Sequence, residues 1–420
     1  MPRKIYTKLT TRQLLPGRGS TAIRLRPPAA GGCYDRPTLA VRETPMPISR
    51  RTFLRSAAAS ALLPVVERPP THLLPGPDGD GPPLAERAAR KGLFYGCCAA
   101  TAYLDDAGFA QALGREAGVL VPEWEGKRGR IERRPGVYDY SAADRLAGFA
   151  RRHLMALRGH ALVWHLSNPG WLDEALSAPG ASDRLITDYI ARVVGHYRGQ
   201  IQSWDVVNEA VEVEDGRPDG LRASPWLKAF GPGYIDTAFH AARRADADAV
   251  LVYNDYGLSA ADPWSASRRR AVLALLTGLR RRDTPCHALG IQGHLRAFGP
   301  RFDPDVFRRF LAEVAALRYR IIITELDVRD DGGPTAPAAR DRAVADLTRR
   351  YLDVALDQPA TLGVVTWGLS DRYTWLATPA EHRPGTPPPR PLPLDDALRR
   401  KPMWHAIAAA FDTARPRTHG

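Results

Sequence analysis

The segment "SWDVVNEAV" at residues 203–211 joins a short apolar run to two polar residues, Asn208 and Glu209. Its apolar and β-branched residues predict a buried strand. Burying an amide or a carboxylate without a partner costs about 2–7 kcal/mol, so folding alone gives no reason to place this pair at the end of a strand. We therefore expect Asn208 and Glu209 to have a function.

Similar apolar runs recur between about residue 85 and residue 412, and longer amphipathic stretches separate them. Candidate helices, such as residues 181–199 and 303–318, repeat apolar residues every three or four positions and carry Ser or Asp at their start as a cap. The eight predicted strands are "LFYGCCA" (93–99), "GVLVPE" (118–123), "ALRGHALVW" (156–164), "SWDVVN" (203–208), "AVLVYND" (249–255), "ALGIQGH" (288–294), "RIIITELDV" (320–328) and "LGVVTWG" (362–368).

This alternation predicts an α/β fold with one catalytic domain, a (β/α)8 TIM barrel. Eight strand–helix repeats match that fold in number and in length. An open doubly wound sheet is the alternative, but no glycine-rich phosphate loop follows the first predicted strand. In such a barrel the C-terminal ends of the strands surround the mouth where substrates bind. Asn208 and Glu209 would lie there.

The stretch "SRRTFLRSAAASALLPVV" at residues 49–66 places two arginines ahead of a small and apolar run, and it resembles a twin-arginine export signal of bacteria. The apolar run is too short to span a bilayer and is broken by Pro64. A chance arginine pair before an amphipathic helix is the alternative. We expect a periplasmic or secreted protein that meets the twin-arginine translocase transiently and has no stable membrane association after export.

The position of this signal also predicts how the chain is divided. Met46 directly precedes the signal, and signals belong at the start of a chain, so we expect an over-long extension before it. A Pro/Gly-rich stretch after the signal reads as a linker. The predicted parts are a disordered extension (1–45), the signal segment (46–67), the linker (68–84), the barrel domain (85–412) and a disordered tail (413–420).

The formal charge of +13 lies mainly in the first 64 residues, which hold 12 basic and 2 acidic side chains. The remaining 47 basic and 44 acidic side chains leave only +3 on the rest of the chain. Because no zinc-finger, basic-zipper or Walker spacing occurs there, we expect no nucleic-acid partner. The cysteines, Cys33, Cys97, Cys98 and Cys286, do not have a metal-ligand spacing, and we expect free thiols.

Polar and aromatic residues lie at the ends of most predicted strands. Glu325 and Asp327 stand two apart, so both face the same side of their strand. His294, at the end of the preceding strand, could hydrogen-bond to both and hold Glu325 ionised and oriented. An ordinary strand-end ion pair is the alternative. The other residues of this kind are Glu123, His160, Trp164, Asn208, Glu209, Asn254, Asp255, Gln292 and Trp367.

Two of these carboxyl groups, on Glu209 and Glu325, would face one cleft. Such a pair is typical of glycoside hydrolysis, in which one group donates a proton to the leaving oxygen and the other attacks or activates water. Trp164, Trp367 and Trp375 would offer flat apolar faces that match the CH-rich faces of pyranose rings. The residues therefore predict an enzyme with a polysaccharide substrate.

Six motifs follow one another in a fixed order over roughly residues 90–410: "GHALVWH", "WDVVNEA", "GIQGHL", "ITELDV", "TWGLSDRYTWL" and "KPMWHAI". This series resembles glycoside hydrolase family 10, the retaining endo-β-1,4-xylanases. The resemblance implies a (β/α)8 barrel that cleaves internal β-1,4 bonds of xylan by double displacement through a covalent glycosyl-enzyme. It also implies that no metal or organic cofactor is needed. We expect the protein to be a monomer.

The resemblance also implies roles for individual residues. Glu209 would be the acid/base and Glu325 the nucleophile, with His294 and Asp327 orienting Glu325. Asn208 would hydrogen-bond to the 2-hydroxyl of the sugar at the point of cleavage. The implied substrate-binding residues are Lys127, His160, Trp164, Asn208, Gln292, Trp367 and Trp375.

Some positions depart from the family's pattern. Trp124 stands where the family has a sugar-binding asparagine, Arg128 where it has a tryptophan, and Leu166 and Ser167 where it has Ser-Gln. These departures predict altered binding of the substrate. Arg128 is expected to be a solvated surface side chain, with preference for an acidic sugar substituent as the alternative. Two other functions stay open, a barrel glycosidase of the same clan that acts on another β-glycan and a carbohydrate-binding protein that has lost turnover.

Overall fold

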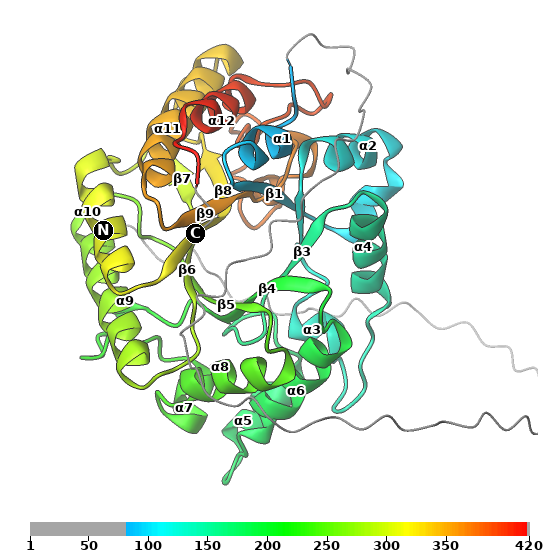
Figure 1. Cartoon of the computed structure of the whole chain (residues 1–420), viewed down its shortest axis with the longest axis vertical. Coiled ribbons are helices and arrows are strands. Elements are labelled where there is room, and N and C mark those ends of the chain that lie inside the picture. The colour runs from blue at the N-terminus through cyan, green and yellow to red at the C-terminus, as the bar shows by residue number, and fades with distance from the viewer. Residues whose placement is uncertain (1–80, 418–420) are drawn as a thin grey trace, which may run out of the picture. The chain divides into compact units, whose positions relative to one another are not determined.

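The computed structural model describes residues 81–417 of the chain. In this part, parallel strands form one sheet in the order β6-β5-β4-β3-β2-β1-β9-β8-β7, and pairing of β6 with β8 closes the sheet into a barrel (Figure 1). The predicted (β/α)8 barrel is confirmed. The strands are β1 Phe94–Ala99, β2 Val119–Pro122, β3 Ala156–Gly159, β4 Ile201–Asn208, β5 Val250–Asp255, β6 Ala288–Ile291, β7 His294–Arg296, β8 Arg320–Arg329 and β9 Thr361–Thr366.

Helices alternate with the strands and surround the barrel (Figure 1). The α-helices are α1 Leu84–Ala89, α2 Ala107–Glu116, α3 Arg128–Ile131, α4 Ser141–Arg152, α5 Gly170–Ser177, α6 Arg184–His196, α7 Pro225–Phe230, α8 Tyr234–Ala245, α9 Pro263–Arg281, α10 Pro304–Ala316, α11 Pro337–Asp357 and α12 Pro402–Thr413. Short 3-10 helices cover η1 Thr101–Asp105, η2 Val213–Asp215, η3 Asp371–Tyr373 and η4 Trp375–Ala377.

Local sequence signals set the starts of several helices. The Asp262 side chain accepts a hydrogen bond from the backbone N–H of Ser265 at the start of α9, and Asp303 caps α10 in the same way. Proline stands in the first turn of both helices, where its missing N–H costs no hydrogen bond. These caps fix where the helices begin, and so the lengths of the loops that lead to them from the mouth.

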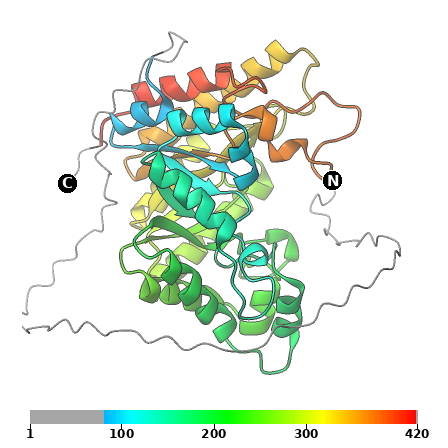
Figure 2. The ribbon, with the colours of Figure 1, turned by 90° about the vertical axis from the view of Figure 1, so that its right-hand side faces the viewer.

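The end of the barrel region packs beside its beginning. The C-terminal helix α12 (red) lies against α1 (blue), as Figure 2 shows. Beyond α12, the backbone N–H of Arg417 donates to the carbonyl of Lys91 at 2.8 Å, and the Arg417 side chain donates to the carbonyl of Leu356 at 2.6 Å. Residues 414–417 therefore lie on the barrel, in contrast to the disorder expected of residues 413–420.

Two predicted strands are shorter than expected. β3 ends at Gly159 instead of continuing to residue 164, because the backbone leaves the ladder at His160 and pairs again only at Val163, in an isolated bridge. The run predicted at 288–294 is divided into β6 and β7, because Gly293 between them has a φ of +77°, a left-handed conformation that glycine adopts without strain. The break directs β7, which begins at His294, along the outer end of β8.

The strands are buried on both faces, since helices cover the outside and side chains fill the inside. Alternation along β1 places Tyr95 and Cys97 in the main hydrophobic cluster. It places Cys98 in a small second cluster with Val121 and Val365. This packing makes the barrel a solid scaffold, and it leaves the strand ends at the mouth to carry the polar groups.

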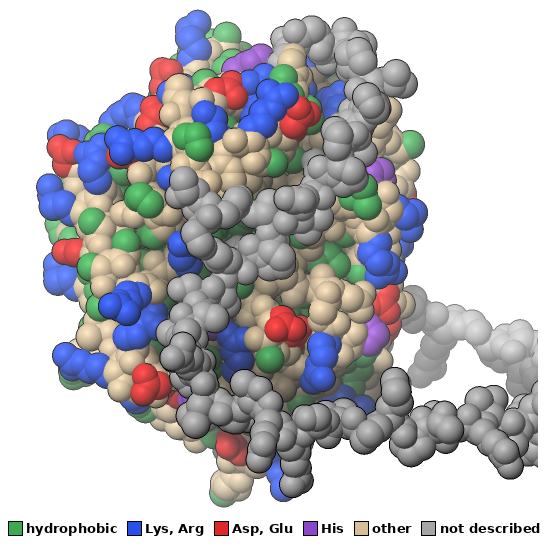
Figure 3. Space-filling view, in the orientation of Figure 1, with side chains coloured by type: hydrophobic (Ala, Val, Ile, Leu, Met, Phe, Trp, Pro, Cys, Tyr) green, Lys and Arg blue, Asp and Glu red, His purple; other side chains and the backbone are tan. Residues whose placement is uncertain are grey.

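The remaining sequence predictions concern thiols, the surface and the first residues. Cys97, Cys98 and Cys286 are buried free thiols, as predicted, whereas Cys33, the extension 1–45 and the signal segment 46–67 lie outside the described residues. On the face in Figure 3, Lys and Arg side chains are interspersed with Asp and Glu.

Of the helices in residues 81–417, none is long and apolar enough to cross a membrane.

Replacing Gly159 with alanine should destabilise the barrel, because an added Cβ would lie 2.1 Å from the ring of the buried Trp204. Overpacking of this kind costs about 1–3 kcal/mol in unfolding free energy. Gly195→Ala is the matched control, since Gly195 lies in α6 with open space around an added Cβ. Thermal unfolding should show a lower midpoint for G159A and not for G195A, and equal midpoints would contradict this packing.

Candidate active site

The polar residues at the strand ends meet at one mouth of the barrel. Asn208 is the last residue of β4, and Glu209 follows it with a left-handed backbone, at a φ of +58°. Gln292 directly follows β6, and Glu325 lies in the outer half of β8. Parallel strands of a closed barrel end on the same side, so residues far apart in the sequence come together here.

His294 joins Glu325 to Asp327, as predicted. Its Nε2 lies 3.2 Å from Glu325 Oε2, and its Nδ1 lies 2.9 Å from Asp327 Oδ1. Trp375 Nε1 donates to the second oxygen of Asp327 at 2.7 Å. Burial alone would lower the pKa of His294, but Asp327 and Glu325 raise it to about 10. At neutral pH the ring is therefore an imidazolium, and both of its N–H groups donate.

Glu325 is buried and held in its ionised form. Asn254 Nδ2 donates to Glu325 Oε1 at 2.7 Å, and His160 Nδ1 lies 3.9 Å from the same oxygen. Burial alone would raise the pKa of Glu325, but the His160 and His294 imidazoles and the Asn254 amide outweigh it and lower the pKa to about 2. A carboxylate that stays charged in a buried site can act as a nucleophile or stabilise a positive charge.

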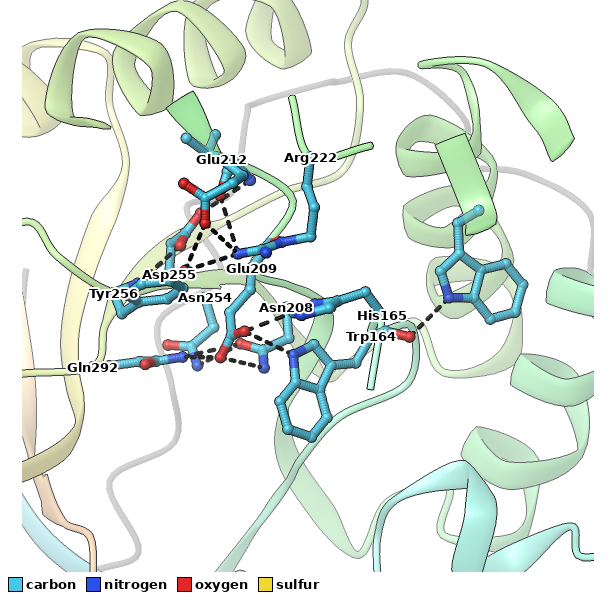
Figure 4. Close-up of polar contacts among 12 residues, drawn as sticks. Trp164, His165, Asn208, Glu209, Glu212, Arg222, Asn254, Asp255, Tyr256 and Gln292 are labelled. Atoms are coloured by element: carbon cyan, nitrogen blue, oxygen red, sulfur yellow. Dashed lines mark hydrogen bonds and ion pairs between the residues drawn. The ribbon is translucent and has the colours of Figure 1, made fainter. Parts of the chain in front are cut away.

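The carboxyl group of Glu209 has neutral donors instead (Figure 4). Trp164 Nε1 donates to Glu209 Oε2 at 2.9 Å, and Gln292 Nε2 donates to Oε1 at 3.0 Å. His165 Nδ1 lies 3.8 Å from Oε2, and burial lowers the pKa of His165 to about 4, so this ring is neutral at neutral pH. The two carboxyl groups of the site therefore have different hydrogen-bond donors, an imidazolium and an amide for Glu325 and only uncharged N–H groups for Glu209.

Side-chain amides connect these two carboxyl groups. Asn254 Nδ2, which donates to Glu325, also lies 2.9 Å from the oxygen of the Asn208 amide. Gln292 Nε2, which donates to Glu209, lies 3.4 Å from the same Asn208 oxygen. This chain of contacts places Glu209 and Glu325 in one site, on either side of Asn208.

Asn254 carries no predicted role, although it lies near the end of a predicted strand. Thr324 Oγ1 donates to Asn254 Oδ1 at 2.6 Å, which leaves the Asn254 Nδ2 group to face Glu325. Asn254 is also the register partner of Asn208 in the pairing of β4 with β5. That alignment of two strand-end amides is the sequence signal that could have identified it.

Lys127, predicted to bind substrate, is buried among tryptophans. Its Nζ lies 4.2 Å from the ring centroid of Trp124, 4.9 Å from that of Trp164 and 6.0 Å from that of Trp367. Burial lowers the pKa of Lys127, and the charge of Glu325 partly offsets this effect. The ammonium group thus stands beside the two carboxyl groups and next to flat apolar faces, in a place suited to contact sugar hydroxyls.

His160 completes the group of predicted residues. Its Nδ1 lies 2.9 Å from Asp205 Oδ2, and Asp205 also pairs with Arg158 inside the barrel. The His160 ring packs edge-to-face against Trp367, with 5.2 Å between the centroids. All predicted site residues therefore belong to one connected group. Within the described residues, no group of three or more His, Cys, Asp or Glu side chains could hold a metal ion.

Arg128 corrects the prediction of a solvated surface side chain. It is only 5% exposed and pairs with Glu132 at 2.8 Å. Its guanidinium lies 4.2 Å from the ring centroid of Tyr189 and donates to the carbonyl of Leu185 at 2.6 Å. Since these partners occupy it, Arg128 supports the wall beside Lys127, and the alternative contact with an acidic substituent is not favoured either.

The other residues that depart from the family's pattern are two partly exposed apolar side chains and one residue with an unusual backbone conformation. Trp124 and Leu166 are each 38% exposed, which is unusual for large apolar side chains of this barrel. Ser167 has a left-handed backbone with a φ of +55°, and its carbonyl accepts from the N–H of Gly129 at 2.7 Å. The chemistry of the site is therefore surrounded by a more apolar rim than the resemblance implies.

Comparison with known proteins places this geometry in a family. Residues 83–410 match glycosyl hydrolase family 10. A β-1,4-xylanase of Dictyoglomus thermophilum is 33% identical over 294 residues, which cover 67% of this chain and 80% of that protein. Endo-1,4-β-xylanase B of Thermotoga neapolitana is 32% identical over 263 residues, covering 62% of this chain and 72% of that protein.

Solved structures agree with the sequence relatives. Native xylanase 10B of Thermotoga maritima superposes with a TM-score of 0.70 at 30% identity, covering 79% of this chain and 98% of that one. Xylanase 10B of Thermotoga petrophila in complex with xylobiose gives a TM-score of 0.72 at 29% identity, covering 80% and 98%. The family match extends over the whole barrel and includes every strand that carries a site residue. The chain belongs to glycosyl hydrolase family 10.

Proposed function

We propose that the chain is an endo-1,4-β-xylanase that cleaves internal β-1,4-xylosidic bonds of xylan with retention of configuration. The observation that carries this proposal is the pair of carboxyl groups on Glu209 and Glu325, joined through side-chain amides and placed in different electrostatic surroundings. A retaining glycosidase needs one ionised nucleophile and one proton donor in the same site. Glu325, beside an imidazolium, fits the first role, and Glu209, among neutral donors, fits the second.

In the first step, an oxygen of Glu325 attacks the anomeric carbon of the bound sugar. The bond from that carbon to the glycosidic oxygen breaks as Glu209 donates its proton to the leaving oxygen, which departs as a hydroxyl group. The product is a glycosyl ester of Glu325 and an ionised Glu209. Because the pKa of Glu325 is about 2, its attacking form is available throughout the neutral and mildly acidic range.

In the second step, Glu209 acts as a base. It removes a proton from a water molecule, whose oxygen attacks the anomeric carbon while the ester bond to Glu325 breaks. Glu325 recovers its carboxylate and Glu209 its proton, so the enzyme returns to its starting state. Trp164 and Gln292 hold the Glu209 carboxyl group in place for both transfers.

Xylan as substrate is supported by relatives and by the residues around the carboxyl groups. Thermotoga petrophila xylanase 10B was solved with xylobiose, and a mutant xylanase of Thermoanaerobacterium saccharolyticum with xylotriose. Asn208 lies between the two carboxyl groups, where it can hydrogen-bond to the 2-hydroxyl of the reacting sugar. Lys127 and the tryptophans near it offer a cation and flat faces for the adjoining sugar.

Purified protein should release reducing ends from xylan, and far fewer from β-glucan or mannan. Glu325→Ala should lose about 10⁴-fold or more of this activity and keep its fold, because the nucleophile is missing. Azide ions should restore turnover on an activated aryl xyloside and give the product of inverted configuration. Cleavage of another β-glycan but not of xylan would contradict the proposed substrate, and wild-type activity in E325A would contradict the proposed nucleophile.

Replacing His294 with glutamine should move the acid limb of the kcat/KM profile to higher pH. Glu325 attacks only when ionised, so activity falls as the pH drops through its pKa. Loss of the imidazolium should raise that pKa from about 2 by about one unit or more. The profile is measured on an activated aryl xylobioside. His196→Gln, at an exposed histidine paired with Asp144, is the control, and an unmoved acid limb in H294Q would contradict this coupling.

We also propose that the chain acts as a monomer in the periplasm or outside the cell, after export by the twin-arginine route. The export route is supported by the sequence, in which Arg50 and Arg51 precede a run of small and apolar residues. Replacing both arginines with lysine should leave the protein in the cytoplasm of a producing bacterium, as judged by activity in cell fractions. Periplasmic accumulation of that variant would contradict the proposed route.

A further inference from the structure

The backbone of Glu209 has a conformation that its neighbours must hold. Its φ of +58° lies in the left-handed region, which residues with a side chain adopt only when surrounding contacts stabilise it. The N–H of Glu209 donates to the carbonyl of Asn254 at 2.9 Å. The carbonyl of Glu209 accepts from Arg222 Nε at 2.8 Å. Both polar groups of this residue's backbone are thus fixed by other parts of the barrel mouth.

The chain returns to Glu209 through a short antiparallel pairing. The N–H of Glu212 donates to the carbonyl of Gly220 at 2.9 Å, and the N–H of Arg222 donates to the carbonyl of Ala210 at 2.7 Å. An isolated antiparallel bridge joins Val211 to residue 221 between these two contacts. The pairing brings Arg222 next to the peptide of Glu209, although thirteen positions separate them in the sequence.

The guanidinium of Arg222 is itself held in place (Figure 4). Its terminal nitrogen donates to the hydroxyl of Tyr256 at 2.8 Å and lies 3.2 Å from Glu212 Oε2. The Tyr256 hydroxyl donates in turn to Glu212 at 2.9 Å. These contacts leave the Nε–H of Arg222 directed at the carbonyl of Glu209, on the side opposite to Trp164.

Neighbouring charges balance that of Arg222. Arg268 lies 3.4 Å from Glu212 and 2.5 Å from Asp255, so this cluster pairs two guanidinium groups with two carboxylates. Arg222 therefore acts on Glu209 through a specific hydrogen bond more than through uncompensated charge. The carboxyl oxygens of Glu209 are bound by other residues, so the arginine does not occupy the group that transfers the proton.

We propose that Arg222 is a positioning residue for the acid/base of this enzyme. Its hydrogen bond to the Glu209 carbonyl fixes the left-handed peptide, and the peptide fixes the direction in which the carboxyl group meets the leaving oxygen. A catalytic group displaced by about 1 Å can lose about 100-fold in rate, so the hydrogen bond can matter to catalysis without any contact with substrate. This inference rests on the proposed role of Glu209.

The test is the dependence of kcat/KM on the leaving group. Arg222→Met keeps an unbranched side chain but removes the donors, and a series of aryl β-xylobiosides varies the need for protonation. We expect a loss of about 100-fold with the poorest leaving group and of less than about threefold with the best. Arg222→Lys, which keeps the charge, should show a smaller loss of the same kind. Glu209→Ala gives the limiting dependence for comparison.

Arg269→Met is the matched control. Arg269 is buried and, like the partly buried Arg222, donates to backbone carbonyls, those of Leu258 and Ala260, but it has no contact with Glu209. It should lower the thermal midpoint without changing the leaving-group dependence. If R222M loses activity equally on all leaving groups, or loses none, the proposal is overturned. If R222M does not fold, the leaving-group dependence of kcat/KM in R222K tests the proposal by the same criterion.

The experiment also separates this inference from the proposed substrate. If the wild type does not cleave xylosides, the same series is run on the aryl β-glycoside that it does cleave. Failure of the xylan assay would then leave the comparison of R222M, R222K and R269M intact. A parallel loss across that series would still overturn the role of Arg222.

Discussion

The pairing of β6 with β8 is the constraint on which the site depends, because it closes the sheet and turns separate strand ends into one mouth. At the end of this ladder the N–H of Glu325 donates to the carbonyl of Gln292 at 2.8 Å. Across the mouth the N–H of Glu209 donates to the carbonyl of Asn254 in the same way. Each carboxyl-bearing residue is thus anchored by its backbone to a neighbouring strand. Without this pairing, β4, which Glu209 follows, and β8, which contains Glu325, would be connected only through β3, β2, β1 and β9.

Closure brings the two carboxyl groups together, and their neighbours then make them different. His160, together with His294, which Asp327 keeps protonated, keeps Glu325 charged. Glu209 instead accepts hydrogen bonds from an indole N–H and an amide N–H, which are uncharged. Two residues of the same type can therefore carry opposite tasks in one site, as retention requires.

Much of this arrangement could be predicted from the sequence, because it follows from strand geometry. Glu325 and Asp327 share a face because side chains alternate along a strand, and the contact of His294 with both followed from its place at the end of the preceding strand. The prediction of a solvated Arg128 was wrong because the burial of this side chain depends on Tyr189 and Leu185, and no local sequence pattern connects these residues to it. Arg222 lies in an irregular segment, where periodicity carries no information about what a side chain reaches.

Trapping of the covalent intermediate tests the central claim, that Glu325 is the nucleophile and Glu209 its acid/base partner. A 2-deoxy-2-fluoro-xylobioside with an activated leaving group slows release of the glycosyl-enzyme more than its formation, so the ester accumulates. Peptide mapping by mass spectrometry should then find one added fluoro-xylobiosyl group on the peptide that contains Glu325. A label on Glu209 or on any other residue, or inverted product from a natural xylan oligosaccharide, would contradict the account.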